Sequence, residues 1–450
     1  MNWTTSIILN FISCYILLSV IIHVCIAAIS IIKTKYYYNK NSFTDYNTLV
    51  SSSNAPNISV ITVAYNQTDI ILNNVKQLLS THYNNLEIII INNSNSDNVL
   101  KELIDTYNLQ PVNVFIDSKI PTEKIKTIYK SKNPIYKKII VVDKPKTNKA
   151  DCLNTGINIA SSKYITHINS NCILEQDAIL KLLQPFLEET TQKIIATGGI
   201  IQTKADTTST PQTFLKKVIN NTLVLKHSKT LLLEYMGGTK LNELLFSSGL
   251  FMVFDKKTAI ESGGYTSEKT GEDIELIMRM RRYMQQNKTP YKVVFIPENL
   301  CCKKEEPNIK NLISKQSSWI FKLLESFNSH KKIFFNRAYG SLGLFNYPYW
   351  LFFKFLVPFF KGVIFTYLIA ISLLGQVSWE LVFNLFILLY SLKIIHSFIA
   401  ILTEIIIQDQ HHNNYSISKK IATAILEPFV LNPISIISFF KGSFQYIKRK

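Results

Sequence analysis

Apolar residues gather toward the two ends of the chain, and one long run lies at its start. Residues 1–32 contain no lysine, arginine, aspartate or glutamate. This run exceeds the ~20 apolar residues that a helix needs to cross a bilayer, so it predicts a membrane-spanning helix. A cleaved signal peptide would have basic residues before a shorter apolar run. Lys33, Lys35 and Lys40 follow directly, which predicts a cytosolic flank and an N-terminus on the outside.

Two further hydrophobic stretches follow in the last quarter of the chain. Residues 347–375 can cross a bilayer once, and Pro358 is expected to divide them into an interfacial helix and a span. Residues 377–407 can cross back. Ionisable side chains in this second stretch are costly in lipid and should face protein or an interface: they are Lys393, His396 and Glu404.

The last apolar stretch, residues 421–440, is interrupted by Glu427, Pro428 and Pro433. The chain then ends in Lys-Arg-Lys, and a spanning segment would place this basic end outside. We therefore expect a pair of helices lying at the cytosolic interface.

The region between the apolar segments alternates β-branched runs with amphipathic ones. Residues 58–66, 86–93 and 137–143 are strand-like, whereas residues 69–80 and 149–160 are helical in pattern. Continuous apolar strands between amphipathic helices are typical of a mainly parallel sheet that is covered on both faces. The sequence therefore predicts an α/β domain joined to membrane helices. The expected domains are a transmembrane helix (1–33), a linker (34–56), a cytosolic domain (57–340), two transmembrane helices with an interfacial segment (341–408) and interfacial cytosolic helices (409–450).

Polar residues follow several of these strands. In a parallel sheet, ligands bind at the carboxyl ends of the strands. We therefore expect Asn66, Asn92–Asn93 and Asn169–Asn171 to lie around one crevice.

Composition narrows the choice of partners. The chain is 47% hydrophobic with a mean hydropathy of +0.12, as expected for a folded domain joined to membrane segments. Its net charge of +18 fits attraction to anionic lipid headgroups or to a phosphate-bearing substrate, or a lysine-rich solvated surface. No basic, aromatic-studded recognition motif is present, so nucleic acid is not an expected partner. The six cysteines form no CxxC pair, which indicates free thiols in a reducing compartment.

Seven segments, in order, resemble motifs of the family-2 membrane glycosyltransferases, the group of the processive polysaccharide synthases. The resemblance covers nearly the whole chain and implies a GT-A-like domain with transmembrane and interfacial helices. The segments are ISVITVAYNQ, EIIIINNSNSD, NKADCLNTG, SSGLFMVF, GGYTSEKTGEDIELIMRM, YKVVFIPENL and NRAYGSLGLFNYPYW.

This resemblance implies transfer from a nucleotide sugar, with a UDP-sugar expected, and inversion at the anomeric carbon. A divalent metal, Mg²⁺ or Mn²⁺, would neutralise the departing diphosphate, and a carboxylate would take the proton of the attacking hydroxyl. Asp273 corresponds to that base and Glu272 is its neighbour. The alternative is that this acidic pair only complements the dipole at the start of a helix.

The other site residues also follow from the resemblance, and each has a structural alternative. Asp151 could be an exposed acid in the first turn of a helix, Lys149 a surface lysine, and Trp319 an interfacial tryptophan. The candidates for donor binding are Asn66, Asn93, Lys149, Asp151, Asn169 and Asn171, and those for the acceptor side are Ser248, Gly249, Gln316 and Trp319.

The chain departs from the family pattern where the metal is expected. Asn93 stands where the family has an aspartate, and Asn169-Ser170-Asn171 replaces the Asp-x-Asp triplet. Gly271 replaces the threonine before Glu-Asp. Asparagine offers a metal one neutral oxygen, whereas hard cations prefer carboxylates. A metal at Asn171 is therefore expected to be weakly bound or absent.

The QxxRW motif of the family is also altered. Alignment on Trp319 places Lys315 at the glutamine position and Ser318 at the arginine position. Alignment on Gln316 makes the motif one residue short. The missing arginine removes a fork-shaped donor for phosphate.

Two functions remain open from the sequence. The first is a multi-pass enzyme of the cell (inner) membrane, with a cytosolic site that transfers sugar to a growing surface glycan. The second is a catalytically inactive homologue that serves as a binding or assembly subunit beside a companion synthase or export subunit. Retention of Asp273 favours the enzyme, and loss of the metal triplet favours the second hypothesis.

Overall fold

The computed structural model divides the chain into two compact units. The sheet unit comprises Phe43–Lys204 and Leu245–Glu305, and the helical unit comprises Met1–Ser42, Ala205–Leu244 and Glu306–Lys450. The structure describes residues 3–41, 55–65, 68–93, 97–188, 191–205, 213–237, 250–266, 272–305, 308–408 and 417–449.

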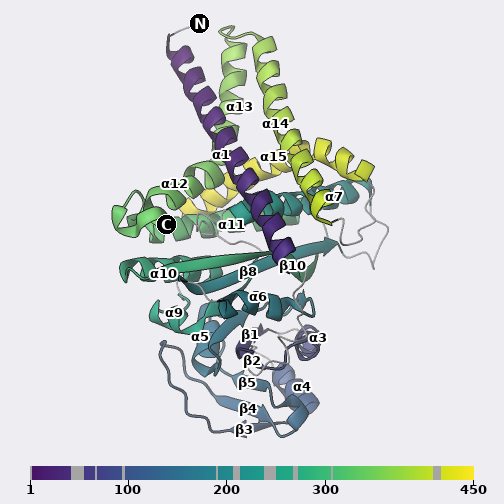
Figure 1. Ribbon diagram of the computed structural model, residues 1–450, viewed down its shortest axis with the longest axis vertical. Helices are drawn as coiled ribbons and strands as arrows, with labels where there is room; N and C mark the ends of the chain where they lie inside the picture. Colours follow the sequence, from purple (N-terminus) through teal and green to yellow (C-terminus); the bar gives the residue numbers. More distant parts are fainter. Residues whose placement is uncertain are drawn as a thin grey trace. The chain divides into compact units, whose positions relative to one another are not determined.

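The described residues form one ten-stranded mixed sheet (Figure 1). Its strands are β1 Ile58–Ala64, β2 Leu86–Asn92, β3 Leu109–Val112, β4 Thr127–Ser131, β5 Ile139–Asp143, β6 Tyr164–His167, β7 Cys172–Leu174, β8 Lys193–Ala205, β9 Leu250–Asp255 and β10 Tyr291–Glu305. They lie in the order β3-β4-β5-β2-β1-β6-β9-β8-β10-β7. The central strands β5, β2, β1 and β6 are parallel. This centre confirms the predicted α/β fold class, and antiparallel pairs extend it on both sides.

The parallel centre is the most apolar part of the sheet. Every residue of β1 is buried, as expected for a strand that is covered on both faces. Val60 lies opposite Ile88, and Ile61 lies opposite both Ile89 and His167. This register brings the carboxyl ends of β1 and β6 to the same edge of the sheet.

Helices of the sheet unit pack on this centre. Helix α5, Lys149–Ile159, contacts β1 and β2. Gly156 allows the close approach, because a Cβ atom there would lie 2.5 Å from Cγ2 of Ile61. The other helices of this unit are α3 Thr68–Leu79, α4 Asp97–Tyr107, η1 Pro134–Tyr136, α6 Ala178–Leu187, α9 Lys256–Glu261 and α10 Glu272–Gln286.

The helical unit contains three described helices that are long and apolar enough to cross a membrane: Asn10–Asn41, Val382–Ile406 and Ile417–Arg449. A fourth crossing is available if Leu342–Phe355 and Val357–Leu373 act as one span, although a 45° bend separates them. The bend lies beside Pro358, which confirms the predicted break. The helices of this unit are α1 Trp3–Asn41, α7 Phe214–Lys229, η2 Thr230–Tyr235, α11 Ile309–Ser329, η3 Lys331–Ile333, η4 Arg337–Tyr339, η5 Leu342–Asn346, α12 Tyr347–Trp350, η6 Leu351–Phe355, α13 Val357–Leu373, α14 Trp379–Gln408 and α15 Ile417–Arg449.

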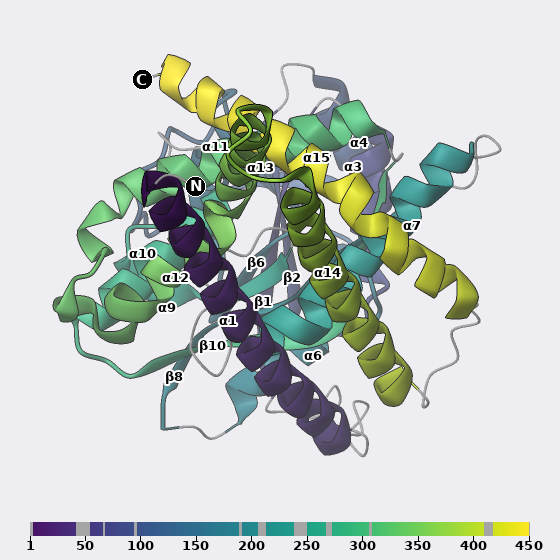
Figure 2. The ribbon, with the colours of Figure 1, turned by 90° about the horizontal axis from the view of Figure 1, so that it is seen from above.

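The C-terminal segment forms one helix, α15, instead of the expected pair (Figure 2). Pro428 and Pro433 lie inside it without ending it. Proline removes a backbone hydrogen bond from a helix interior, so neighbouring contacts must compensate. Helix α15 packs against α11, α7, α13 and α14, and these contacts hold the interrupted segment in a single helix.

Two of the three ionisable residues that are predicted to face protein, Lys393 and Glu404, have polar partners within the helical unit. Lys393 donates a hydrogen bond to Asn432, and Lys420 lies 3.0 Å from a carboxylate oxygen of Glu404. Because each partner belongs to the other helix, these contacts join α14 to α15.

Candidate functional site

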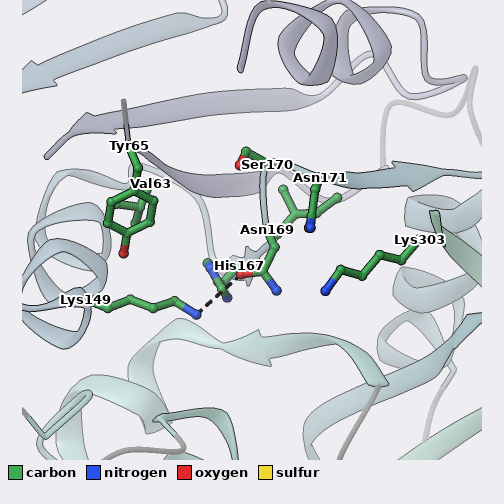
Figure 3. Close-up of a pocket in the computed structure, with 9 residues that line it drawn as sticks. Val63, Tyr65, Lys149, His167, Asn169, Ser170, Asn171 and Lys303 are labelled. Carbon is green, nitrogen blue, oxygen red and sulfur yellow. Dashed lines mark hydrogen bonds between the residues drawn. The ribbon is translucent and has the colours of Figure 1, made fainter. Parts of the chain in front are cut away.

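A pocket of about 290 Å³ lies at the carboxyl ends of β1 and β6 (Figure 3). The end of each strand contributes to it, as does the turn after β6. The described residues that line it are Val63, Tyr65, Lys149, His167, Ile168, Asn169, Ser170, Asn171 and Lys303. The altered triplet therefore lies in the crevice that the strand pattern predicts.

Backbone hydrogen bonds hold the triplet in place. The Ile168 amide donates to the Ile61 carbonyl at 3.0 Å and continues the β1–β6 pairing by one residue. The Cys172 amide donates to the Asn169 carbonyl at 3.0 Å and closes the turn into β7. Asn169 and Asn171 are exposed on this turn, so their amides can meet a ligand without rearrangement of the sheet.

Two lysines approach the triplet from different elements. Lys149 is the first residue of α5, and its Nζ donates to Oδ1 of Asn169 at 3.4 Å. Lys303 lies on β10 and pairs with Cys172, the residue that follows the triplet. In Figure 3 the two side chains extend from opposite sides toward Asn169. The pocket therefore presents two ammonium groups beside the neutral amides.

His167 adds no positive charge to the pocket near neutral pH. Burial lowers the pKa of its imidazole well below the usual value, and the nearby charge of Lys149 lowers it further. Desolvation and a neighbouring cation both disfavour the charged imidazolium. The positive charge among the described lining residues therefore comes from Lys149 and Lys303.

The described lining residues do not fit a divalent metal. Mg²⁺ and Mn²⁺ favour carboxylate and other oxygen ligands, whereas the described lining side chains include no carboxylate. Across the described part of the chain, no group of three or more His, Cys, Asp or Glu side chains could hold a metal ion. Two ammonium groups beside the triplet would also repel a cation.

Asn93 does not line the pocket, and its side chain fixes a neighbouring loop. Its Nδ2 donates to the Thr147 carbonyl at 3.0 Å, and its Oδ1 accepts from the Thr147 amide at 2.8 Å. This paired contact ties the end of β2 to the segment that leads into α5. Asn93 thereby acts on the position of Lys149 through the backbone.

Asp151 is buried and is not among the described residues that line the pocket. Its Oδ1 accepts from the Glu123 amide at 2.8 Å, and its Oδ2 forms an ion pair with Lys144. Lys144 is buried and also donates to Oγ1 of Thr155 at 2.8 Å. This partner could not be predicted from the sequence, because Lys144 is one of several lysines in its segment.

Several predicted site residues lie where little can be described. Asn66, Ser248 and Gly249 are outside the described residues. Glu272 and Asp273 begin α10, but their side chains are not described. Their predicted roles stay predictions.

Gln316 and Trp319 lie on α11 of the helical unit. Both are partly buried. Nε1 of Trp319 is buried without a hydrogen-bond partner among the described residues. An indole N–H of this kind usually finds a partner.

Lys303 is a pocket residue that sequence reasoning did not identify. The expected strand ends at residue 300, whereas β10 continues to Glu305. The added residues pair with β7, and this pairing is a tertiary contact between segments about 130 residues apart. The only local signal is the run of charged residues after an apolar strand.

Two family models match this chain. The family model described as Glycosyl transferase family 2 matches residues 59–258. The model described as Glycosyl transferase family group 2 matches residues 164–398, which is more than half of the chain.

Two curated relatives are poly-beta-1,6-N-acetyl-D-glucosamine synthases. The protein from Staphylococcus epidermidis is 22% identical over 286 residues, which cover 63% of this chain and 59% of the relative. The protein from Staphylococcus aureus is 25% identical over 223 residues, or 50% and 45% of the two chains. The chain thus spans about half of the length of the curated relatives it matches.

A solved structure has a similar fold. It is described as mannosyltransferase PcManGT from Pyrobaculum calidifontis in complex with GDP-Man and Mn2+. The alignment has a TM-score of 0.51 and 12% identity, and it covers 96% of this chain and 99% of the other. This likeness confirms the predicted GT-A-like fold.

Proposed function

The chain belongs to glycosyl transferase family group 2, and we propose that it transfers a sugar from a nucleotide-sugar donor to a growing surface glycan. The observation that carries the proposal is the cationic pocket at the carboxyl ends of β1 and β6. A nucleotide sugar carries an anionic diphosphate, and such groups are bound by lysine ammonium groups. The pocket also lies where open α/β sheets bind their ligands.

The donor is proposed to be a UDP-sugar. The curated relatives are named as synthases of a polymer of N-acetyl-D-glucosamine, which supports an amino-sugar donor among those to test. Lys149, Asn169 and Asn171 would contact the donor, together with Asn66. Asn93 and Asp151 would act indirectly through their contacts with the loops around α5.

Asp273 is the proposed general base, with Glu272 beside it. It would take the proton of the acceptor hydroxyl while that oxygen attacks the anomeric carbon and the nucleoside diphosphate leaves, which inverts the anomeric configuration. Ser248 and Gly249 are proposed on the acceptor side. Gln316 and Trp319 belong to the same proposal.

The protein is proposed to be a multi-pass membrane protein with a cytosolic sheet unit. The described helices that could cross a membrane support the first part, and the basic flank at Lys33 and Lys35 supports the orientation. Cysteines placed singly at residue 2 and residue 449 can be labelled in intact cells, after Cys14 and Cys25 are changed to serine. We expect labelling at residue 2 only. Labelling at residue 449 would mean that α15 spans.

A transfer assay on purified membranes tests the activity. Membranes with the natural chain should release UDP from one member of a panel of UDP-sugars and incorporate its sugar into a polymer. Asp273→Asn should reduce this rate ~10²–10⁴-fold, as expected for loss of a general base, while UDP binding stays unchanged. Equal rates for the two proteins would remove Asp273 from the mechanism. No transfer under any donor would contradict the enzymatic proposal.

A catalytically inactive assembly subunit is the second candidate. The observation that favours it is the absence of carboxylates from the described lining of the pocket. Such a subunit would co-purify with a companion synthase and raise that protein's transfer rate, and Asp273→Asn would leave the increase intact. A normal rate from the companion alone would contradict this second function.

A further inference from the structure

The pocket holds positive charge where its family has a metal site, and this charge comes from side chains on two separate elements. Lys149 enters from the start of α5, and Lys303 enters from β10. Each extends toward the triplet, with Asn169 between them (Figure 3). A group bound beside Asn169 would therefore meet ammonium groups on two sides.

The backbone fixes both lysines against the triplet. The side chain of Asn148 caps α5 by accepting from the Asp151 amide at 2.8 Å, so the first turn that carries Lys149 is held in position. Strand β10 pairs with β7 from Cys301 to Lys303. Lys303 thus lies directly across from the residue that follows Asn171, and its placement depends on the sheet itself.

The asparagines keep this positive charge available. An aspartate at residue 169 would form an ion pair with Lys149, whose Nζ already lies 3.4 Å from the side-chain oxygen there. Asparagine makes the hydrogen bond without cancelling the charge. The substitutions that remove metal ligands therefore also place no carboxylate of the triplet beside Lys149.

We propose that this pocket binds the diphosphate of its nucleotide ligand without a divalent cation, through the ammonium groups of Lys149 and Lys303. The inference rests on the proposed function, because it concerns the same donor pocket. Each ammonium has three hydrogen-bond donors, and charge-assisted bonds to phosphate oxygens are strong. In a transfer reaction, the two ammonium groups stabilise the negative charge that develops on the diphosphate as its bond to the anomeric carbon breaks.

Calorimetric titration of the full chain with UDP, GDP and inorganic pyrophosphate tests this assignment. In EDTA the natural protein should bind at least one of the two nucleotides, and pyrophosphate should compete with it. Adding Mn²⁺ or Mg²⁺ should change the dissociation constant less than about threefold, after correction for metal binding by the free nucleotide. Lys149→Met and Lys303→Met should each weaken binding about tenfold, the effect of one charge-assisted hydrogen bond.

Two control variants separate the loss of a phosphate contact from an effect on folding. Lys303→Arg keeps the charge and should retain most of the affinity. Lys292→Met removes a lysine from the same strand outside the pocket lining and should leave the dissociation constant unchanged. Equal binding by Lys303→Met and Lys292→Met would exclude Lys303 from the site.

The outcomes distinguish the inference from the proposed function. Binding of UDP that strengthens more than about threefold with Mn²⁺ would overturn metal-independent binding by the two lysines and leave nucleotide-sugar transfer standing. No binding of either nucleotide, with or without metal, would contradict both the proposed function and diphosphate binding by the two lysines. Metal-independent binding that both lysine variants weaken would support both.

Discussion

Conversion of Asn169 and Asn171 to aspartate tests whether the lysines of the pocket bind nucleotide without a metal ion. The change places two carboxylates at the turn after β6, where the family places its metal ligands. One of them would lie about as close to Lys149 as the present amide oxygen, which is 3.4 Å from its Nζ. We expect the double variant to bind nucleotide more weakly than the natural protein in EDTA, and to gain binding when Mn²⁺ is added.

The size of the effect follows from the new ion pair. Two unit charges 4 Å apart interact by about 4 kcal/mol at an effective dielectric constant of about 20. Asn169 is exposed, and exposed ion pairs retain only ~0.2–1 kcal/mol. Two such carboxylates should therefore weaken UDP binding in EDTA by about tenfold. Mn²⁺ should restore at least that factor, because hard cations prefer carboxylate ligands.

Calorimetric titration of UDP with and without Mn²⁺ measures both effects. A variant with serine at residues 169 and 171 is the matched control, since it removes the amides without adding charge and should show no metal response. If the remainder of the site is intact, the aspartate variant should also gain transfer activity. Strong Mn²⁺ dependence in the natural protein would refute this reasoning. No metal response in the aspartate variant would show that more than the triplet has changed.

Three further predictions concern stability and pH. Glu427→Ala should lower the free energy of unfolding by ~3–5 kcal/mol, because it leaves the nearly buried Lys229, now 2.7 Å from its carboxylate, without a counter-charge. Thermal unfolding in detergent measures this loss, and equal melting of the variant and the natural protein would contradict it. Gly156→Ala should destabilise by ~1–3 kcal/mol through overlap with Ile61. The additional loss should be smaller in an Ile61→Ala background, and an equal loss there would exclude the overlap. Burial lowers the pKa of His167 in the folded chain, so near pH 6 the unfolded chain binds a proton at this residue and the folded chain does not. The free energy of unfolding should therefore fall by up to ~1.4 kcal/mol per pH unit as the pH falls below about 6.5. His167→Gln should reduce that slope in denaturant unfolding between pH 7 and 5, and an unchanged slope would refute the assignment.

The parallel centre of the sheet could be predicted because its signal is local. The runs that form β1, β2 and β5 are continuous and β-branched, and each is long enough to be read without its neighbours. Strand β3 has four residues and includes a proline, so the pattern gives no strand signal there. Its pairing with β4 depends on contacts that only the folded sheet supplies.

Prolines were informative in one helix and misleading in another. Pro358 lies at the start of α13, where its missing amide is not needed, and the predicted break is present. Pro428 and Pro433 carry the same local signal but lie inside α15. The contacts of α15 with several neighbouring helices outweigh the local preference, and a local pattern contains no information about them.

The candidate site also contains residues that could be predicted from the sequence and residues that could not. The rule that ligands bind at strand ends places the triplet in the pocket, and Lys149 follows from the resemblance of the segment NKADCLNTG to a family motif. Lys303 depends on the register of β10 on β7, which no local pattern reveals. Asp151 could be identified as a residue of interest, but its buried partner Lys144 could not, and this partner turns it away from a direct role.

The altered triplet removes the metal ligands, but it does not by itself lower the formal charge of the pocket. Two aspartates, Lys149, Lys303 and a divalent cation would together carry the same formal charge as two asparagines with the same two lysines. A diphosphate would meet an equal positive charge in either case. A bound metal ion can dissociate on dilution, whereas the two ammonium groups belong to side chains of α5 and β10. What separates an enzyme from an inactive homologue is therefore not the charge at the donor phosphates but the base that accepts the acceptor proton. Asp273 is retained at that position in the sequence, and its substitution divides the two functions more directly than any change to the triplet.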